Sequence, residues 1–163
     1  LVEYETVIEE VRGERVIPHV IEPSFGIDRI IYAALEHSFS EEPVECETRN
    51  VLHLPAEVAP VQVAVLPLLT REELIKPALA ITKTLRENEV FVSYDDSGTI
   101  GRRYRRNDEI GTPFSVTIDY ETLDYDTVTI RDRDSMAQIR VPVGELAETI
   151  SVMIREGFTK PVQ

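Results

Sequence analysis

The sequence predicts an α/β fold over residues 56–163, with a mixed, mainly five-stranded sheet and about three helices. Val61 to Leu66 form a β-branched run that is typical of a buried strand. Leu74, Ala78 and Leu85 recur at helical spacing. Phe114 to Tyr120 alternate with a period of two, as in a strand with one covered face. Because strands and helices alternate along the chain, we expect a sheet that contains parallel pairs.

The first part of the chain carries weaker signals. Leu1 to Val20 suggest strand-like material with a turn at Gly13. From Ile27 to Phe39 the apolar residues recur at helical spacing, while Asp28 and Glu36 lie off the apolar stripe. This second pattern predicts one buried amphipathic helix.

An acidic and irregular linker is expected from Ser40 to Pro60, because prolines at positions 43, 55 and 60 interrupt regular structure. Within it, only Val51 to Leu54 suggest a short strand. From Val61 onward the chain can close a core of its own. We therefore predict two units, residues 1–55 and residues 56–163.

The remaining elements follow in order. A helix is expected to open at Thr70, with Pro77 either kinking it or marking its true first turn. A turn at Asp95 to Gly98 precedes a helix that runs through Asp108, and Leu123 to Asp126 form a polar turn. The expected order is strand (61–66), helix (from 70), strand (89–93), helix (through 108), strand (114–120), strand (127–135), a further strand and a helix marked by Val143, Leu146, Ile150 and Ile154.

Composition narrows the class of protein. The 163 residues carry a formal net charge of −13, which argues against sequence-independent coating of nucleic acid and leaves room only for a local basic site. Cys46 is the only cysteine, so an internal disulfide and a multi-cysteine zinc site are excluded, and a reducing, cytoplasmic setting is natural. His19, His37 and His53 show no metal spacing, so no metal site is predicted. With no run of about 18 apolar residues, no membrane partner is expected.

Three segments carry residues suited to chemistry. In Glu22 to Arg29 a Pro-Ser-x-Gly turn leads into a helix, where Gly26 allows close backbone approach and Arg29 can pair with phosphate oxygens. Arg102 to Arg106 place four guanidinium groups around one tyrosine. Arg131 to Asp134 alternate in charge, so an extended strand would put Arg131 and Arg133 on one face and Asp132 and Asp134 on the other. The alternatives are a turn with a surface arginine, a solvated turn and a surface ladder of ion pairs, respectively.

The same segments resemble a known family. Glu22-Pro-Ser-x-Gly-x-x-Arg29 resembles motif 3 of class II aminoacyl-tRNA synthetases in its glycyl form. Ala59 to Leu68 resemble the first strand of the class IIa anticodon-binding domain. Asp95 to Phe114 and Thr127 to Ser135 are similar to the archaeal and eukaryotic type of glycyl-tRNA synthetase, in the family's order and spacing.

The resemblance implies a division of labour. Residues 1–55 would be the terminal strand–helix segment of a class II catalytic domain, and residues 56–163 the anticodon-binding domain. The whole enzyme would be a homodimeric glycine–tRNA ligase that uses glycine, ATP with Mg²⁺, and tRNA(Gly). The motifs 1 and 2 of class II enzymes are not found in this sequence. The chain is therefore expected to be a piece of a longer enzyme, inactive by itself and without a cofactor requirement of its own.

Site roles follow from the resemblance, position by position. Glu22 would hold the ammonium group of glycine and Ser24 would help to close its pocket. Gly26 and Arg29 would bind ATP, with Arg29 as the catalytic arginine that stabilises charge on the phosphate. A glycine anticodon presents two cytosines, which arginines and carboxylates can read, so Arg131, Asp132, Arg133 and Asp134 are predicted to contact the bases. Arg102, Arg103 and Arg106 are predicted to contact RNA phosphates.

Two other functions stay open. One is a noncatalytic tRNA-binding adaptor or polymerase accessory subunit with an anticodon-binding fold, against which Glu22, Ser24 and Arg29 argue. The other is a small unrelated α/β enzyme that uses the Asp95–Asp96 pair.

Overall fold

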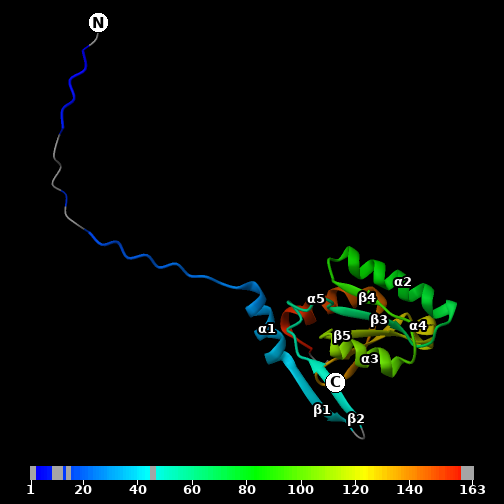
Figure 1. Ribbon diagram of the computed structural model, residues 1–163. Helices are drawn as coiled ribbons and strands as arrows, with labels where there is room; N and C mark the ends of the chain where they lie inside the picture. Colours follow the sequence, from blue (N-terminus) through cyan, green and yellow to red (C-terminus); the bar gives the residue numbers. More distant parts are fainter. Residues whose placement is uncertain (1–2, 9–12, 14–15, 45–46, 159–163) are drawn as a thin grey trace.

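The computed structural model describes residues 3–8, 13, 16–44 and 47–158. An amino-terminal helix and hairpin precede an α/β domain (Figure 1). The elements are α1 (Ile27–Ser38), β1 (Phe39–Val44), β2 (Glu47–Leu52), β3 (Val63–Pro67), α2 (Glu72–Glu87), β4 (Val92–Tyr94), α3 (Ile100–Glu109), β5 (Phe114–Ile118), α4 (Tyr120–Tyr125), β6 (Thr127–Asp132), β7 (Gln138–Pro142), a 3-10 turn (Val143–Glu145) and α5 (Leu146–Glu156).

The mixed five-stranded sheet is confirmed, with strand order β4-β3-β5-β6-β7. β3 pairs in parallel with β4 and β5, in a register that sets Val63 beside both Val92 and Phe114. β6 and β7 continue the sheet in antiparallel fashion. The first crossover carries α2 and the second carries α3 past β3, so the two helices lie on opposite faces.

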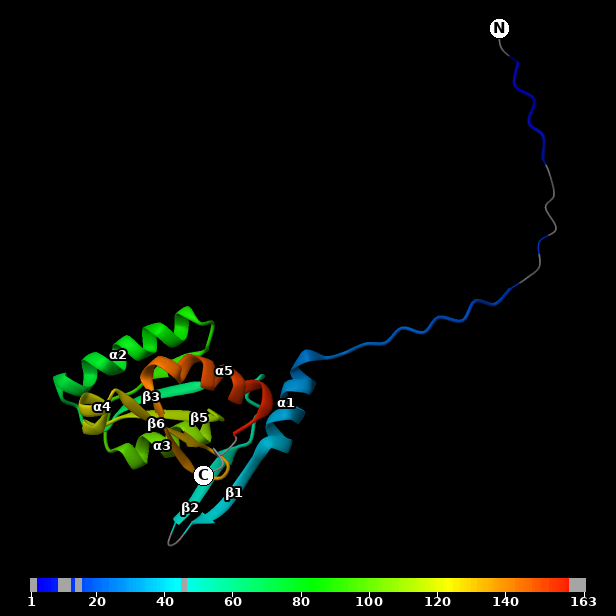
Figure 2. The ribbon, with the colours of Figure 1, turned by 180° about the vertical axis from the view of Figure 1, so that it is seen from behind.

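The two faces of the sheet differ in chemistry. Figures 1 and 2 show α2 and α5 on one face and α3 on the other. The first face holds the apolar core, in which Val65, Val116 and Ile130 of the sheet pack with Leu74 of α2 and Ile150 of α5. The α3 face is polar, because the buried residues of α3 are Arg103, Asn107 and Asp108. Burial of apolar area on the first face is therefore the main source of stability.

The segment that was predicted to be an irregular linker is largely a β-hairpin. β1 and β2 pair antiparallel, with Phe39 opposite Leu52 and Glu42 opposite Arg49. Pro43 is compatible with this hairpin because β1 is an edge strand of a two-stranded sheet. β2 packs against α3, and Gly111 has a φ of +82° with Leu52 O only 3.0 Å from where a Cβ would stand. A glycine therefore permits the close approach of the hairpin to the domain.

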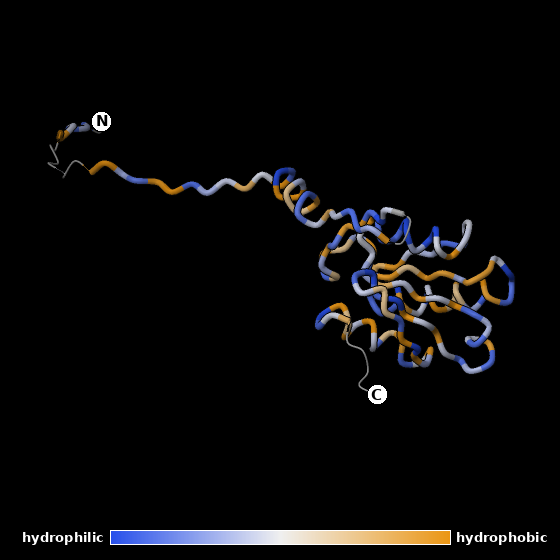
Figure 3. Tube along the Cα trace, turned by 90° about the horizontal axis from the view of Figure 1, so that it is seen from below, coloured by the Kyte–Doolittle hydropathy of each residue, from blue (hydrophilic) through white to orange (hydrophobic). Residues whose placement is uncertain are grey.

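The helix predicted from Ile27 to Phe39 is confirmed as α1, but its burial is not. None of its residues is buried, and Ile27, Ile30 and Leu35 are exposed. In the preceding described residues, 3–8, 13 and 16–26, there is no strand or helix, so the strand-like prediction for Leu1 to Val20 fails there. Figure 3 shows apolar residues along this segment and α1, outside the α/β domain. Residues 1–2, 9–12 and 14–15 of the predicted strand-like segment, and also Cys46, lie outside the described residues.

Two smaller corrections concern loops. Helix α2 begins at Glu72 rather than Thr70, and the Thr70 hydroxyl instead donates to the carbonyl of Asp96, 2.9 Å away. Of the predicted polar turn at Leu123 to Asp126, the first three residues belong to the short helix α4 and Asp126 is its C-cap. Its Asp119 N-cap accepts from the backbone of Thr122, and the Thr122 hydroxyl accepts from the backbone of Asp119. This capping box satisfies backbone donors at the start of α4 and so stabilises a helix of only six residues.

Candidate nucleic-acid interface

The strand order creates a switch point between β3 and β5, at the carboxyl ends of these two strands. The chain leaves β3 towards β4, whereas it leaves β5 towards β6 on the other side. Connections that diverge in this way open a crevice outside the carboxyl ends of the strands, where doubly wound α/β domains bind their ligands. We call the residues gathered there the carboxyl-edge surface: Thr70, Arg71, Asp95, Asp96, Ser97, Arg102, Arg106 and Tyr120.

Arg103 lies beneath the carboxyl-edge surface and holds two of its loops together by hydrogen bonds. Its side chain is only 1% exposed, and its guanidinium donates to the carbonyls of Pro67 at 2.5 Å, Leu68 at 3.2 Å and Asp95 at 3.2 Å. Pro67 ends β3, Leu68 follows it and Asp95 follows β4. The prediction that Arg103 contacts an RNA phosphate is therefore not compatible with this structure, because the guanidinium is buried and both of its terminal nitrogens donate to backbone carbonyls.

Arg102 and Arg106 point away from the interior on the same helix. Arg106 is exposed and donates to Asp95 Oδ2 at 2.5 Å and to the Ser97 carbonyl at 2.7 Å. Burial alone would raise the pKa of Asp95, but hydrogen bonds from Ser97 and Arg106 outweigh it and lower that pKa below its ordinary value. Arg102 is also exposed. The loop between β4 and α3 is thus held in shape by the Arg106 contacts, while Arg102 and Arg106 of α3 face solvent.

A tyrosine stabilises the same loop. The Tyr94 hydroxyl donates to Asp96 Oδ2 at 3.0 Å. Burial, together with the hydrogen bond to the Asp96 carboxylate, raises the pKa of Tyr94 to about 12. Tyr94 therefore stays neutral, and stays a donor, throughout the physiological range.

Tyr120 and Arg71 complete the carboxyl-edge surface. Tyr120 is 38% exposed at the start of α4, and the Arg71 guanidinium carbon lies 6.0 Å from the centre of its ring. The neighbouring Asp119 caps α4 and pairs with Arg140 of β7. Burial would raise the pKa of Asp119, but the hydrogen bonds from Arg140 and Thr122 outweigh burial and lower it.

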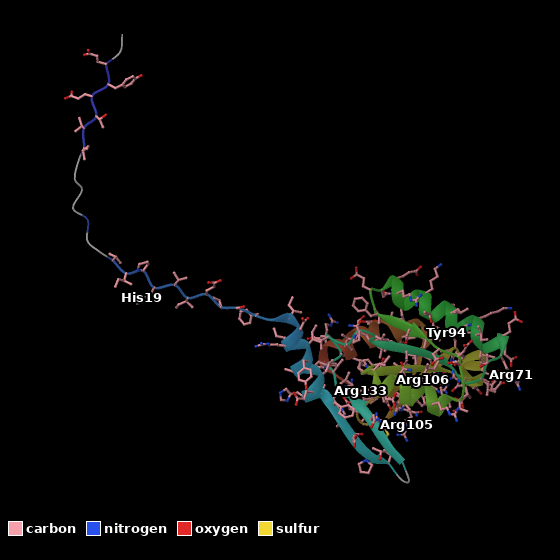
Figure 4. The ribbon with its side chains drawn as sticks, viewed as in Figure 1. His19, Arg71, Tyr94, Arg105, Arg106 and Arg133 are labelled. Atoms are coloured by element: carbon pink, nitrogen blue, oxygen red, sulfur yellow. The ribbon has the colours of Figure 1, made fainter. Side chains whose placement is uncertain are left out.

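The predicted base-reading segment lies at the other end of the sheet. Asp132, the last residue of β6, sits opposite Phe114, the first residue of β5. Figure 4 shows Arg133 beside the β1–β2 hairpin and Arg71 at the far end of the domain. The structure therefore does not bring Arg131 to Asp134 together with the carboxyl-edge surface.

A buried ion cluster lies at this end of the sheet, near the start of β5. Asp108 of α3 accepts from Arg49 Nε at 2.8 Å and from Arg131 at 3.0 and 3.3 Å. Arg131 also lies 4.7 Å from the centre of the Tyr104 ring. Arg49 is 1% exposed and donates further to Glu42 and to the carbonyl of Arg133. Desolvation would lower the pKa of Arg49, but the Asp108 and Glu42 carboxylates outweigh desolvation and raise it, so Arg49 stays charged.

Arg133 and Asp134 extend the cluster to the hairpin. Arg133 is buried and donates to the carbonyls of Leu54 and Gly111, at 3.0 and 2.9 Å, and to its neighbour Asp134. Asp134 also meets His53 Nδ1 at 2.6 Å. Burial would raise the pKa of Asp134, whereas the Arg133 and His53 contacts lower it.

These contacts change the role of the predicted base readers. Arg131 and Arg133 do share a face, as the alternation predicted, but that face is the interior. Asp132 is buried too and accepts from the backbone and hydroxyl of Ser135. Direct contact of these three side chains with a base is not compatible with their burial, and only Asp134 of the four is exposed.

The motif-like residues near the amino terminus lie outside the domain. Gly26 is the N-cap residue of α1, so the predicted start of a helix is confirmed, but residues 23–26 are extended and form no turn. Glu22, Ser24 and Arg29 are all exposed, and within the described part of the chain they are not gathered into a pocket. No group of histidine, cysteine and carboxylate side chains suited to a metal ion occurs among residues 3–8, 13, 16–44 and 47–158. Nor does the described chain contain a helix long and apolar enough to cross a membrane.

The fold and the carboxyl-edge surface define a class: a small, doubly wound α/β domain that presents arginines and a tyrosine at its switch point. Residues 62–153 match the family model described as anticodon binding domain. The chain belongs to this anticodon-binding domain family.

Relatives and solved structures agree with that assignment. The chain is 55% identical over 150 residues to a glycine–tRNA ligase of Methanothrix thermoacetophila, covering 92% of this chain and 26% of that protein. It is 57% identical over 141 residues to the glycine–tRNA ligase of Archaeoglobus fulgidus, covering 86% of this chain and 25% of that one. A crystal structure of prolyl-tRNA synthetase from Cryptosporidium parvum with L-proline and AMP matches 66% of this chain and 24% of its own, at 27% identity and a TM-score of 0.62. This chain thus spans about a quarter of the curated relatives it matches.

Sequence reasoning missed two parts of the site. Arg71 and Tyr120 were not singled out, because they are far apart in the chain and neither belongs to a cluster. Arg49 and Asp108 were also missed, although a lone arginine in an acidic stretch is a signal that an ion pair is expected nearby.

Proposed function

We propose that this chain is the anticodon-binding part of a glycyl-tRNA synthetase, together with the end of its catalytic domain. The observation that carries the proposal is 55% identity to a glycine–tRNA ligase over 150 residues, which extends beyond the residues matched by the anticodon-binding family. The whole enzyme would activate glycine with ATP and Mg²⁺ and attach it to tRNA(Gly). It would act as a cytoplasmic homodimer. In this chain the catalytic-domain segment would end at residue 55 and the anticodon-binding domain would begin at residue 56.

The catalytic contribution of this chain would come from the segment before α1. Glu22 would bind the ammonium group of glycine and Ser24 would border the same pocket. Gly26 lies at the amino-terminal end of α1, where backbone donors favour phosphate, and Arg29 follows in the first turn. Arg29 would therefore bind ATP phosphate and stabilise the charge that develops during adenylate formation.

The RNA would bind at the carboxyl-edge surface. Arg102 and Arg106 are exposed there and would contact loop phosphates. Arg103, Arg131 and Arg133 would act indirectly, by fixing backbone and neighbouring side chains, and Asp132 would hold the turn after β6. Asp134, which is exposed, stays a candidate for contact at the opposite edge. Because the chain is acidic as a whole, binding would be local.

Binding of an anticodon stem-loop tests the RNA part of the proposal. The dissociation constant is measured by fluorescence anisotropy at several salt concentrations, for the chain and for Arg102→Ala and Arg106→Ala. Each substitution should weaken binding of every loop sequence similarly and lower the salt slope by roughly 0.7 to 0.9. Arg86→Ala is the matched control, because Arg86 is an exposed helical arginine that donates to a backbone carbonyl away from this surface. An unchanged slope in both arginine variants would contradict the proposal.

Pyrophosphate exchange tests the catalytic part. The chain alone should give only background glycine-dependent exchange. In the full-length enzyme, Arg29→Ala should slow activation by about 100- to 1000-fold, the loss expected for one preorganised charge donor. Robust exchange by the chain alone, or normal exchange in the full-length variant, would refute the assigned roles.

A further inference from the structure

We propose that Arg71 and Tyr120 form a clamp for a single unpaired RNA base. The inference rests on the proposed function and deepens it by naming where one loop base is held. The chemical class of the ligand is a planar nucleobase that is not in a base pair. Neither side chain belongs to the arginine cluster that suggested RNA binding from the sequence.

The geometry of the pair suits a flat ligand. The Arg71 guanidinium carbon stands 6.0 Å from the centre of the Tyr120 ring, which is beyond a tight stack. A base inserted between two planes needs about 7 Å, twice the optimal carbon–carbon separation. The Arg71 side chain is exposed and its ion pair with Glu73 is long at 3.7 Å. A shift of about 1 Å by this flexible side chain would therefore admit a base.

The two halves of the clamp differ in stiffness. Tyr120 begins α4, whose start is fixed by the reciprocal hydrogen bonds of Asp119 and Thr122 and by the ion pair of Asp119 with Arg140. Arg71 follows Thr70, which is tied to the Asp96 carbonyl. A fixed aromatic platform with a mobile guanidinium cover is the arrangement used to hold unstacked loop bases.

Position supports the same ligand. The clamp spans the carboxyl ends of β3 and β5, which is the switch-point crevice of this sheet. Arg102 and Arg106 both stand on the neighbouring helix α3, so a backbone held there by its phosphates would present its next bases along this edge. Stacking tolerates any base, so the clamp would contribute affinity rather than identity.

The chain offers a matched control on the same helix. Tyr125 is also exposed, at 74%, but it ends α4 and has no guanidinium over its ring among the described residues. Tyr120→Ala and Tyr125→Ala therefore remove the same group from two ends of one short helix. The capping box uses Asp119 and Thr122, so neither substitution removes it. Circular dichroism and urea unfolding would verify that both variants fold.

Binding of a stem-loop RNA with the anticodon of a glycine tRNA is measured for each variant. Tyr120→Ala should weaken binding about 5- to 150-fold, the loss of one base–aromatic stack, whereas Tyr120→Phe and Tyr125→Ala should bind like the unaltered chain. Replacing the clamped nucleotide by an abasic one should abolish the effect of Tyr120→Ala, because coupled partners are not additive. With 2-aminopurine at that position, its fluorescence should change on binding to the unaltered chain but not to Tyr120→Ala.

Each outcome decides between the proposals. Equal binding by Tyr120→Ala and Tyr125→Ala, or a Tyr120→Phe variant as weak as Tyr120→Ala, would overturn the clamp while leaving RNA binding intact. If the unaltered chain binds the stem-loop no better than a scrambled hairpin, the proposed function fails and the clamp fails with it.

Discussion

Replacing Arg49 by methionine should loosen the hairpin from the α/β domain while leaving the apolar core intact. Arg49 donates to Asp108 and Glu42 at 2.8 Å each and to the carbonyl of Arg133. Net contributions of hydrogen bonds to charged groups are about 1.5 to 3 kcal/mol each, and they are not additive. Asp108 keeps its second partner, Arg131, so the buried carboxylate is not left alone. We therefore expect a loss of about 2 to 4 kcal/mol in the free energy of unfolding.

Two comparison variants bracket that estimate. Asp108→Asn leaves two buried guanidinium groups around a neutral amide and should cost about 3 to 5 kcal/mol. Arg106→Met breaks an exposed pair with Asp95 and should cost less than about 1 kcal/mol. The assay is urea unfolding followed by circular dichroism, with hydrogen exchange of the hairpin amides. For a chain of this size, Arg49→Met should lower Tm by about 4 to 16 °C.

The reasoning would be refuted by equal, small costs for Arg49→Met and Arg106→Met. It would also fail if Arg49→Met lowered protection of the β3 and β5 amides before that of β1 and β2. The first result would mean that the buried cluster is no stronger than a surface pair, and the second that it stabilises the core rather than the hairpin.

Three further outcomes are expected. Gly111→Ala should destabilise the chain more than Gly98→Ala in urea unfolding, because both have positive φ but only Gly111 meets the hairpin; equal costs would contradict this. The pKa of Tyr94 is raised from 10.0 to about 12, so the stability it contributes is present below pH 10 and lost as pH rises towards 12. Tyr94→Phe should therefore reduce the fall in the free energy of unfolding that is measured between pH 10 and about pH 12. Limited proteolysis should give a stable product that begins near residue 56 if the predicted division holds, whereas a product that begins before Phe39 would show that the hairpin belongs to the domain.

Much of the α/β domain could be predicted from sequence because its strongest signals are local. β3, β5 and β6 carry β-branched residues in runs or alternation, and α2 has a clear apolar stripe. α4 was missed because six residues are too few for a periodic pattern, although Asp119 and Thr122 have the spacing of a capping box. β1 was missed because an acidic strand with a proline has no alternation of apolar residues to detect, and only the end of β2, Val51 and Leu52, was predicted as strand.

The site was harder to predict for an electrostatic reason. An arginine cluster in an acidic chain indicates a solvated cationic patch, since buried guanidinium groups are rare without partners. Arg103, Arg131 and Arg133 are buried because their partners are backbone carbonyls and carboxylates contributed by distant segments. Such partners are visible only after the strands have been ordered. The alternation of Arg131 and Arg133 with Asp132 gave no sign that all three side chains are buried.

The two ends of the five-stranded sheet carry different contacts: the Arg71–Tyr120 pair at one end and the attachment of the hairpin at the other. β5 has five residues, so Tyr120, which follows its carboxyl end, is separated by roughly 16 Å of strand from Asp132, which pairs with Phe114 at its start. Substitutions that far apart usually contribute independently. The Arg71–Tyr120 end of the carboxyl-edge surface could therefore change towards another loop sequence, while the attachment of the hairpin through Asp108 stayed unchanged.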